Sequence, residues 1–495
     1  MQTSALLSHP AGVTEALALI HGFDGCLASG LGRLSGDDKH ALDQFLLALE
    51  SSPFAQPLRE ARAQIEGHEV KPAGAFALAA GRAALQGALY DALAARLTEA
   101  LQFPVTHTQG TDTGPNFRAP VAAEAAVLQA AQQWLLELAM HGWRNLGEAE
   151  VAPFALTVTR LLESANLQRA HLVLDGFWRE LCVQVPLSQQ RPVPLTRWAD
   201  LWMRSLLLTR LLPPGGTSSS GKDVTGELTL LGAEVRSHAG YARFSLTGLL
   251  SHKDQDKAEP CLVRVEWQAY KVDLIDGSEI CRIFAPSVDP FLAALADGRL
   301  LEVTGKLDSD GRLRPLSAKV ASKANPVASL RSWLRLAEPL APVEPFDRHP
   351  LHLRYPVLVE GPVGTDLQLN RSEIANEGGA GEGEDLYVEV GGHRFPLTFL
   401  YHPLWSELNP RAVATSVSLI GFWRFERAGW CIQPLCVYAK PLAALAPKSA
   451  ADRKAEGNLP HRWLSTACRA AEQLRSSKST TLETLRERAS KMLRA

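Results

Sequence analysis

This chain of 495 residues carries almost equal numbers of positive and negative side chains, so an excess of charge of one sign is missing. Lysine and arginine together number 51 and aspartate and glutamate 53, so the formal net charge is -2. Proteins that bind polyanions by general attraction usually carry a basic footprint. The balance of charges therefore argues against nucleic acid as a partner.

Long apolar runs and paired cysteines are missing as well. No apolar run approaches the ~18 residues that a membrane helix needs. No Lys or Arg precedes the first apolar residues, so the start of the chain does not resemble a signal peptide. The 7 cysteines are scattered without any Cys-x-x-Cys pair, which indicates free thiols in a reducing compartment. These features predict a cytoplasmic protein without a membrane span.

Motifs of catalysis and cofactor binding are the third absence. Neither Gly-x-Ser-x-Gly nor His-Glu-x-x-His occurs. Gly216–Lys222 matches the G-x-x-x-x-G-K pattern, but it follows a Leu-rich helical stretch and precedes a strand-like one, so we interpret it as a linker. Asp347, His349 and His352 lie close together, yet no further ligand at zinc spacing is near them. We expect no cofactor, no metal and no enzymatic activity.

Helical periodicity is what the first part of the chain does contain. Asp37–Leu49 and Phe76–Leu101 carry apolar residues on one helical side. A loop rich in Thr, Gly and Pro near residues 105–120 would allow two subdomains. Residues 1–212 are therefore expected to form a helical bundle or an array of helical hairpins.

Strand-like alternation begins at about residue 224, after the linker composition of Pro213–Asp223. Two modules, residues 224–325 and 326–446, each contain about five short apolar strands, which suits a small closed barrel of OB-like type. The remaining residues, 447–495, are expected to form a basic helical tail. The predicted fold class is thus multidomain α+β, with a helical half, two tandem barrel-like modules and a tail.

An internal repeat links the two β modules. Leu301–Ala321 and Ser418–Ala439 both run from an apolar strand through a glycine and a glycine turn to a second apolar strand. The corresponding residues are Gly305 with Gly421, Gly311 with Gly429, and Pro315 with Pro434. The pattern predicts two copies of one β module.

Aromatic residues crowd the second copy of this repeat. Phe422, Trp423 and Trp430 lie in one expected hairpin. They would either pack in a core or form an exposed patch for a protein partner. If the sheet were OB-like, they could instead stack single-stranded bases.

The tail is the one basic segment, and it carries a helical stripe of apolar residues. The residues that would contact a partner there are Leu482, Leu485, Arg486 and Met492. A detachable amphipathic helix of this kind favours docking onto another protein.

Three short segments carry a family resemblance: Trp198–Trp202, Gly226–Gly232 and Tyr270–Asp273. They resemble an uncharacterised bacterial family encoded beside MoxR-type AAA+ ATPases, von Willebrand A-domain proteins and SWIM zinc-finger proteins. The resemblance implies a non-enzymatic companion whose partner is the ATPase or the A-domain protein. The predicted function is a scaffold or adaptor; the alternative is a single-stranded nucleic-acid-binding protein.

Overall fold

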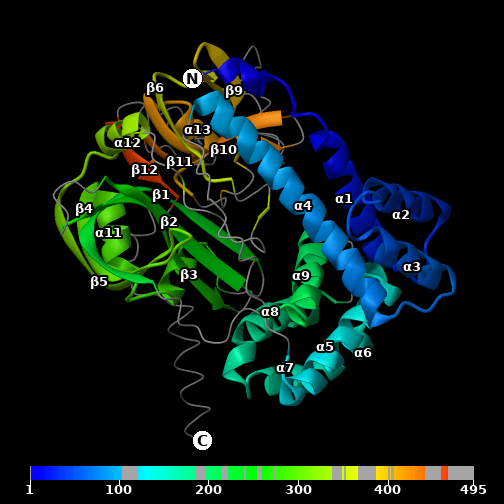
Figure 1. Ribbon diagram of the computed structural model, residues 1–495. Helices are drawn as coiled ribbons and strands as arrows, with labels where there is room; N and C mark the ends of the chain where they lie inside the picture. The colour runs from blue at the N-terminus through cyan, green and yellow to red at the C-terminus, as the bar shows by residue number, and fades with distance from the viewer. Residues whose placement is uncertain are drawn as a thin grey trace, which may run out of the picture.

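The computed structural model describes most of the chain (Figure 1). The described residues are 2–102, 120–185, 195–212, 221–238, 241–253, 259–271, 275, 277–336, 340, 348–349, 353–365, 386–399, 402, 406–426, 429–440 and 459–466. Within this part of the chain, no helix is both long and apolar enough to cross a membrane.

The first half is helical, as the sequence predicts. Its α-helices are α1 Val13–Ser29, α2 Gly36–Ala48, α3 Ala55–Glu66, α4 Pro72–Leu101, α5 Ala122–His141, α6 Glu148–Val151, α7 Ala155–Leu161, α8 Gln168–Gln184 and α9 Leu195–Leu208. The 3-10 turns are η1 Thr3–Leu7, η2 Trp143–Asn145, η3 Ala152–Phe154 and η4 Ala165–Leu167. In Figure 1, α4 runs diagonally across the molecule from η1 to the other helices.

Local sequence explains where these helices begin. Ser35 caps α2: its Oγ accepts from the Asp38 amide at 3.2 Å, and the Asp38 carboxylate accepts from the Ser35 amide at 3.1 Å. Pro72 starts α4, because a first-turn proline has no amide hydrogen to leave unsatisfied. Gly81 within α4 lets a neighbouring chain approach closely, since a Cβ there would meet the Leu49 side chain at 2.8 Å.

The first β module is a five-stranded antiparallel sheet in the order β3-β2-β1-β4-β5. Its strands are β1 Lys222–His238, β2 Tyr241–His252, β3 Cys261–Tyr270, β4 Arg299–Leu307 and β5 Leu313–Lys323. Between β3 and β4 lie η5 Gly277–Glu279, α10 Ile280–Ile283 and α11 Asp289–Asp297. One face of the sheet and α11 enclose a separate hydrophobic core.

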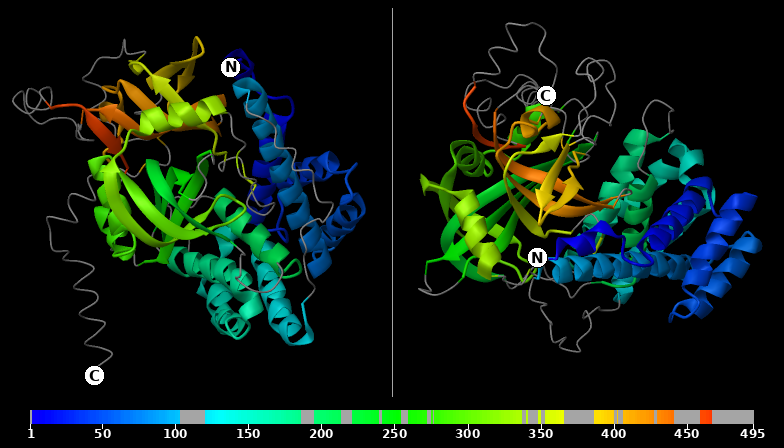
Figure 2. Two further views of the ribbon diagram at one scale, coloured as in Figure 1. Left: turned by 60° about the vertical axis from the view of Figure 1, so that its left-hand side comes forward. Right: turned by 90° about the horizontal axis from the view of Figure 1, so that it is seen from above.

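The second β module contains two smaller sheets, ordered β12-β11-β10-β6 and β7-β8-β9. Their strands are β6 Pro356–Glu360, β7 Gly364–Thr365, β8 Leu386–Val390, β9 His393–Pro396, β10 Ser418–Glu426, β11 Gly429–Ala439 and β12 Arg462–Ser465. Two further helices are α12 Pro326–Leu336 and α13 Pro410–Val413. Figure 2 shows the second module stacked over the first, and α12 packs between them through Leu330 and Trp333.

The prediction of closed OB-like barrels is wrong, because the sheets are open antiparallel sheets. In the first module, an isolated bridge between Arg264 and Arg312 lies between β3 and the turn before β5, and no ladder of strand pairs joins β3 to β5 among the described residues. Alternation of apolar and polar residues shows that one face of a strand is buried, but it does not show whether the outer strands join.

Two local predictions are also wrong. The apolar pattern of Ile280–Ala285 predicts a strand, but Ile280–Ile283 form α10, which buries Ile280 and Cys281 under the first sheet. Within the tail that is expected to be helical, the pattern predicts a helix over Leu459–Leu474, but Arg462–Ser465 form β12 and pair with β11. Here pairing with an existing strand edge outweighs local helix propensity.

The cores connect parts that are far apart in the sequence. The helices of the first half share one hydrophobic cluster with the second β module. Thr3 near the start of the chain donates from Oγ1 to the Val390 carbonyl oxygen at 3.1 Å. On α4, Thr98 Oγ1 lies 2.9 Å from the Tyr355 hydroxyl. The second module therefore completes the helical half rather than standing apart from it.

Matching irregularities occur in the two hairpins that the sequence repeat covers. Gly305 pairs with Pro315 and Gly421 with Pro434, and in each hairpin the strand register shifts immediately before the glycine. A Cβ would meet a carbonyl oxygen across the hairpin at 2.4 Å for Gly305 and 2.6 Å for Gly421. The two hairpins thus share this local backbone geometry, and the origin of both modules from one repeated unit stays a prediction.

Candidate functional site: an arginine junction

The outer face of the first sheet is polar although it faces the interior of the molecule. Glu234 of β1, Ser245 of β2 and Glu266 of β3 lie opposite one another in adjacent strands. Arg236 and Arg243 form the next cross-strand pair. The residues between them face the hydrophobic core, because side chains alternate along a strand. The sheet thus presents charged rows toward the other parts of the protein.

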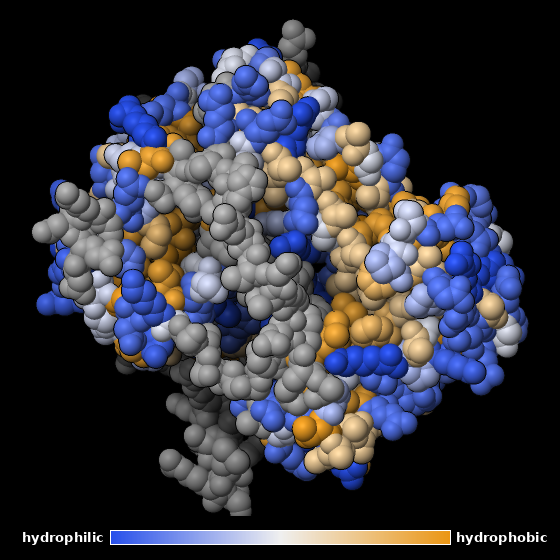
Figure 3. Space-filling view, viewed as in Figure 1, coloured by the Kyte–Doolittle hydropathy of each residue, from blue (hydrophilic) through white to orange (hydrophobic). Residues whose placement is uncertain are grey.

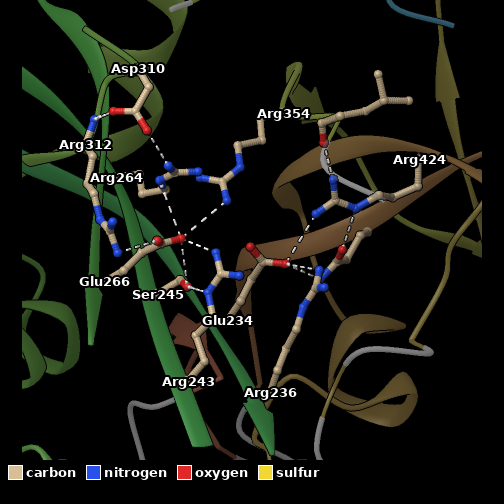
Figure 4. A network of polar contacts seen from close by, with 12 residues as sticks. Glu234, Arg236, Arg243, Ser245, Arg264, Glu266, Asp310, Arg312, Arg354 and Arg424 are labelled. Atoms are coloured by element: carbon tan, nitrogen blue, oxygen red, sulfur yellow. Dashed lines mark hydrogen bonds and ion pairs between the residues drawn. The ribbon is translucent and has the colours of Figure 1, made fainter. Parts of the chain in front are cut away.

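Four guanidinium groups converge on the Glu266 carboxylate (Figure 4). Arg243 bonds to Oε1, Arg264 and Arg354 lie 3.4 Å from the same oxygen, and Arg312 lies 3.3 Å from Oε2. These arginines come from β2, β3, the turn before β5 and the segment before β6. Residues far apart in sequence are therefore brought to one carboxylate.

A second carboxylate, Glu234, joins the two β modules. Arg424 of β10 donates from Nη2 to Glu234 at 3.2 Å, and Gln433 of β11 donates to it at 3.0 Å. Arg424 also donates from Nε to Gln433 at 2.7 Å and from Nη1 to the Leu353 carbonyl oxygen. Its side chain is only 2% exposed, so every polar contact is made inside the protein.

We call this set of charged residues the arginine junction. Its cations are Arg236, Arg243, Arg264, Arg312, Arg354 and Arg424, and its anions are Glu234, Glu266 and Asp310. Around Glu266, the four cations Arg243, Arg264, Arg312 and Arg354 face two carboxylates, Glu266 and Asp310. Buried charges normally occur as matched pairs, so this surplus is unusual.

The arginine junction lies in a recess. Four of its arginine side chains, Arg243, Arg264, Arg312 and Arg354, are between 21% and 36% exposed, whereas Glu266 beneath them is 3% exposed. Figure 3 shows strongly hydrophilic residues set back between the first sheet and the helical half. The guanidinium groups thus surround a buried carboxylate and are themselves partly open to solvent.

The pKa values of Glu266 and Arg354 are both shifted by the arginines that surround Glu266. Burial alone would raise the pKa of Glu266, but Arg243, Arg264, Arg354 and Arg312 outweigh burial and lower the pKa to about 2. Burial and then the like charge of Arg264 lower the pKa of Arg354 to about 10. Arg354 therefore stays charged at neutral pH. Its charged form is destabilised by burial and by Arg264, and a further anion nearby would stabilise it.

The helical half borders the arginine junction on another side. Arg197 of α9 forms an ion pair with Glu180 of α8, and both act electrostatically on Tyr241 at the start of β2. His349 is flanked by Asp200 of α9 and, more weakly, by Arg236 of β1. Burial lowers the pKa of His349 to about 4, so the imidazole is neutral at pH 7. All three parts of the protein therefore meet around this recess.

The chemistry available at the arginine junction is recognition of an oxyanion. Arginine forks donate paired hydrogen bonds to carboxylate and phosphate groups. Among the described residues no group of three or more His, Cys, Asp and Glu could hold a metal ion. Of the residues once considered for a metal, His349 is described and Asp347 and His352 lie outside the described residues.

The three aromatic residues of the second repeat lie in the core. Phe422, Trp423 and Trp430 are 1%, 0% and 4% exposed. Trp423 packs edge-to-face against Phe395, with ring centroids 4.8 Å apart. They offer no surface for a partner or for stacked bases. Of the alternatives predicted from the sequence, the structure therefore shows packing in a core.

The other predicted residues are placed as follows. Leu482, Leu485, Arg486 and Met492, and with them the predicted docking helix, lie outside the described residues. Of the G-x-x-x-x-G-K string only Gly221 and Lys222 are described, and Lys222 is the first residue of β1. A strand following the string agrees with its interpretation as a linker.

The arginine junction is not among the predicted sites, although the sequence contains a local signal for it. Arg243-Phe244-Ser245 and Arg264-Val265-Glu266 alternate charged or polar with apolar residues, as does Glu234-Val235-Arg236. Such alternation usually means a solvated face. Whether that face is covered depends on how the second module and helices pack, which no local pattern reveals.

Comparison with known proteins finds no matching family model, no similar curated protein and no similar solved structure. The assignment of function therefore rests on the residues of the arginine junction and on the surface around it.

Proposed function

We propose that this chain is a cytoplasmic scaffold or adaptor protein that recognises an anionic ligand at the arginine junction. The observation that carries the proposal is the convergence of four partly exposed arginines, Arg243, Arg264, Arg312 and Arg354, on the buried Glu266 carboxylate. Three of these arginines belong to the first β module and Arg354 precedes β6 of the second, so a ligand bound there would contact both modules at once.

The alternative, a single-stranded nucleic-acid-binding protein, has less support. Such proteins combine a basic groove along the strand with aromatic platforms for the bases. Here the cations gather in one recess, and the candidate platforms Phe422, Trp423 and Trp430 are buried. A discrete anionic group fits this arrangement better than a continuous strand.

Sodium citrate should raise the melting temperature of the full chain more than sodium chloride does at equal ionic strength. Ligand at one hundred times its dissociation constant adds about 2.7 kcal/mol, which shifts the melting temperature by about 2–5 °C. Arg312→Gln should reduce this gain, because Arg312 contacts the Glu266 carboxylate from the more exposed side of the recess. Scanning fluorimetry provides the measurement.

The matched control is Arg62→Gln, which removes a cation that pairs with Asp43 on the helical surface. This variant should keep the full citrate effect. Equal stabilisation by citrate and chloride, or an unchanged citrate effect in Arg312→Gln, would refute anion binding at the arginine junction.

A surface for a protein partner lies on residues 155–184, which we call the α7–α8 surface. Leu156, Leu162, Leu172 and Val183 are between 49% and 62% exposed there. Leu172 and Val183 lie about three turns apart on α8 and so share one side of that helix. Gathered exposed apolar side chains are typical of protein contact sites.

Leu172→Asp should weaken binding of the chain to its protein partner by about tenfold or more, because a charge would enter an apolar contact. The partners to assay are the MoxR-type ATPase and the von Willebrand A-domain protein that the family resemblance suggests. Surface plasmon resonance with purified proteins measures the change. Leu47→Asp on α2, where Leu47 is 60% exposed, is the control. An equal loss in both variants would contradict a specific role for the α7–α8 surface.

A further inference from the structure

The arrangement of the arginines points to the kind of anion that the arginine junction binds. The four guanidinium groups around Glu266 approach from four chain segments, so they do not lie along one line or one strand (Figure 4). A planar carboxylate offers two oxygens in one plane, whereas a phosphoryl group offers three oxygens in three directions. Donors that converge from several sides suit the tetrahedral group better.

The number of donors leads to the same conclusion. Each guanidinium carries five N–H groups, and the Glu266 carboxylate has only two oxygens to share among four of them. Ser245 and Asp310 accept from Arg243 and Arg264 respectively. The protein thus supplies fewer acceptors than these arginines have donors, at least among the described residues.

The positive charge around Glu266 favours a doubly charged ligand over a singly charged one. The four arginines around Glu266 face only two carboxylates among the described residues, Glu266 and Asp310, so two of their positive charges have no counter-ion there. A carboxylate ligand would neutralise one of them, whereas a phosphate monoester carries close to two negative charges at pH 7. The dianion therefore relieves more of the repulsion among the arginines.

We infer that the arginine junction is a binding site for the terminal phosphoryl group of a small phosphorylated ligand, held on the solvent side of Arg243, Arg264, Arg312 and Arg354. Glu266 is the fixed counter-ion that these guanidinium groups surround. It aligns the guanidinium groups and lowers the affinity for the incoming anion. This inference rests on the proposed function and adds the chemical class of the ligand.

Calorimetric titration of the full chain with inorganic phosphate, adenosine 5′-monophosphate and acetate tests the inference. Phosphate and the nucleotide should bind, and acetate at the same concentration should not. Arg312→Gln and Arg354→Gln should each lower phosphate affinity by about tenfold or more, because each removes a charge-assisted contact. Arg312→Lys should retain part of the affinity, since it keeps the charge but loses the planar fork. Arg62→Gln is again the control.

Glu266→Gln gives the opposite expectation for phosphate affinity. It removes the competing carboxylate, so phosphate affinity should rise by about tenfold and phosphate should stabilise this variant more than the unmodified chain. Loss of phosphate binding in Glu266→Gln would overturn the inference.

The remaining outcomes separate the possible ligands. Tighter binding of the nucleotide than of inorganic phosphate identifies an organic phosphate as the ligand, and equal binding identifies free phosphate. Stabilisation by citrate without any phosphate binding would overturn this inference and leave the proposed function standing. Tighter, salt-sensitive binding of an oligothymidylate would overturn it in favour of nucleic acid. If no anion stabilises the protein, both proposals fail.

Discussion

Arg424→Met should lower the free energy of unfolding by about 3–5 kcal/mol, because it leaves the Glu234 carboxylate buried without its nearest cation. The substitution also removes the donor to Gln433 and to the Leu353 carbonyl oxygen. Methionine fills a similar volume, so little of the loss comes from packing. Urea unfolding followed by tryptophan fluorescence measures the change.

The double variant Glu234→Gln with Arg424→Met should recover a large part of that loss, since neither charge then remains buried alone. Arg331→Met is the matched control, because Arg331 pairs with Glu360 where both side chains are more than 40% exposed. Exposed pairs contribute about 0–1 kcal/mol. A loss in Arg424→Met no greater than in Arg331→Met would show that the contact between the modules is not stabilising.

Acid should unfold this protein in two stages. Burial lowers the pKa of His349 and His402 from 6.5 to about 4, so the unfolded state binds protons before the folded state does and stability falls between pH 6.5 and 4. The arginines lower the pKa of Glu234 and Glu266 from 4.5 to about 2 against the effect of burial. Their contribution is complete above pH 4.5 and is lost as the pH falls toward 2.

The lower stage should remove on the order of 3 kcal/mol for each of the two glutamates. Urea unfolding at a series of pH values from 7.5 to 3 provides the measurement. His349→Gln should flatten the upper stage and Glu266→Gln the lower one. A free energy of unfolding that is constant between pH 7 and 4 would contradict the burial of the two histidines.

Much of the helical half could be predicted because its signals are local. The stripe of leucines in α4 and the acidic first turn of α2 are visible in the sequence. The sequence does not reveal α3, because two prolines so close together, Pro53 and Pro57, usually end a helix, whereas Pro57 lies in the first turn of α3.

The β modules could be predicted as strands but not as an assembly. The hairpin of β10 and β11 follows from its two apolar runs and the glycine turn between them, whereas the closure of the sheet depends on pairings between distant segments. The candidate site shows the same limit. Arg354 and Glu266 are 88 residues apart, and no sequence pattern links them.

The hydrophobic cluster shared by the helical half and the second β module determines when the helical half can complete its core during synthesis. The helices of the first half complete their core only with strands that the ribosome makes much later, up to Leu464 of β12. The first β sheet has a core of its own and needs no such partner. Contacts between the two ends of a chain carry a loop-closure cost and form slowly. The helical half is therefore completed after the first β sheet, and its apolar helix faces need protection until β12 has been made.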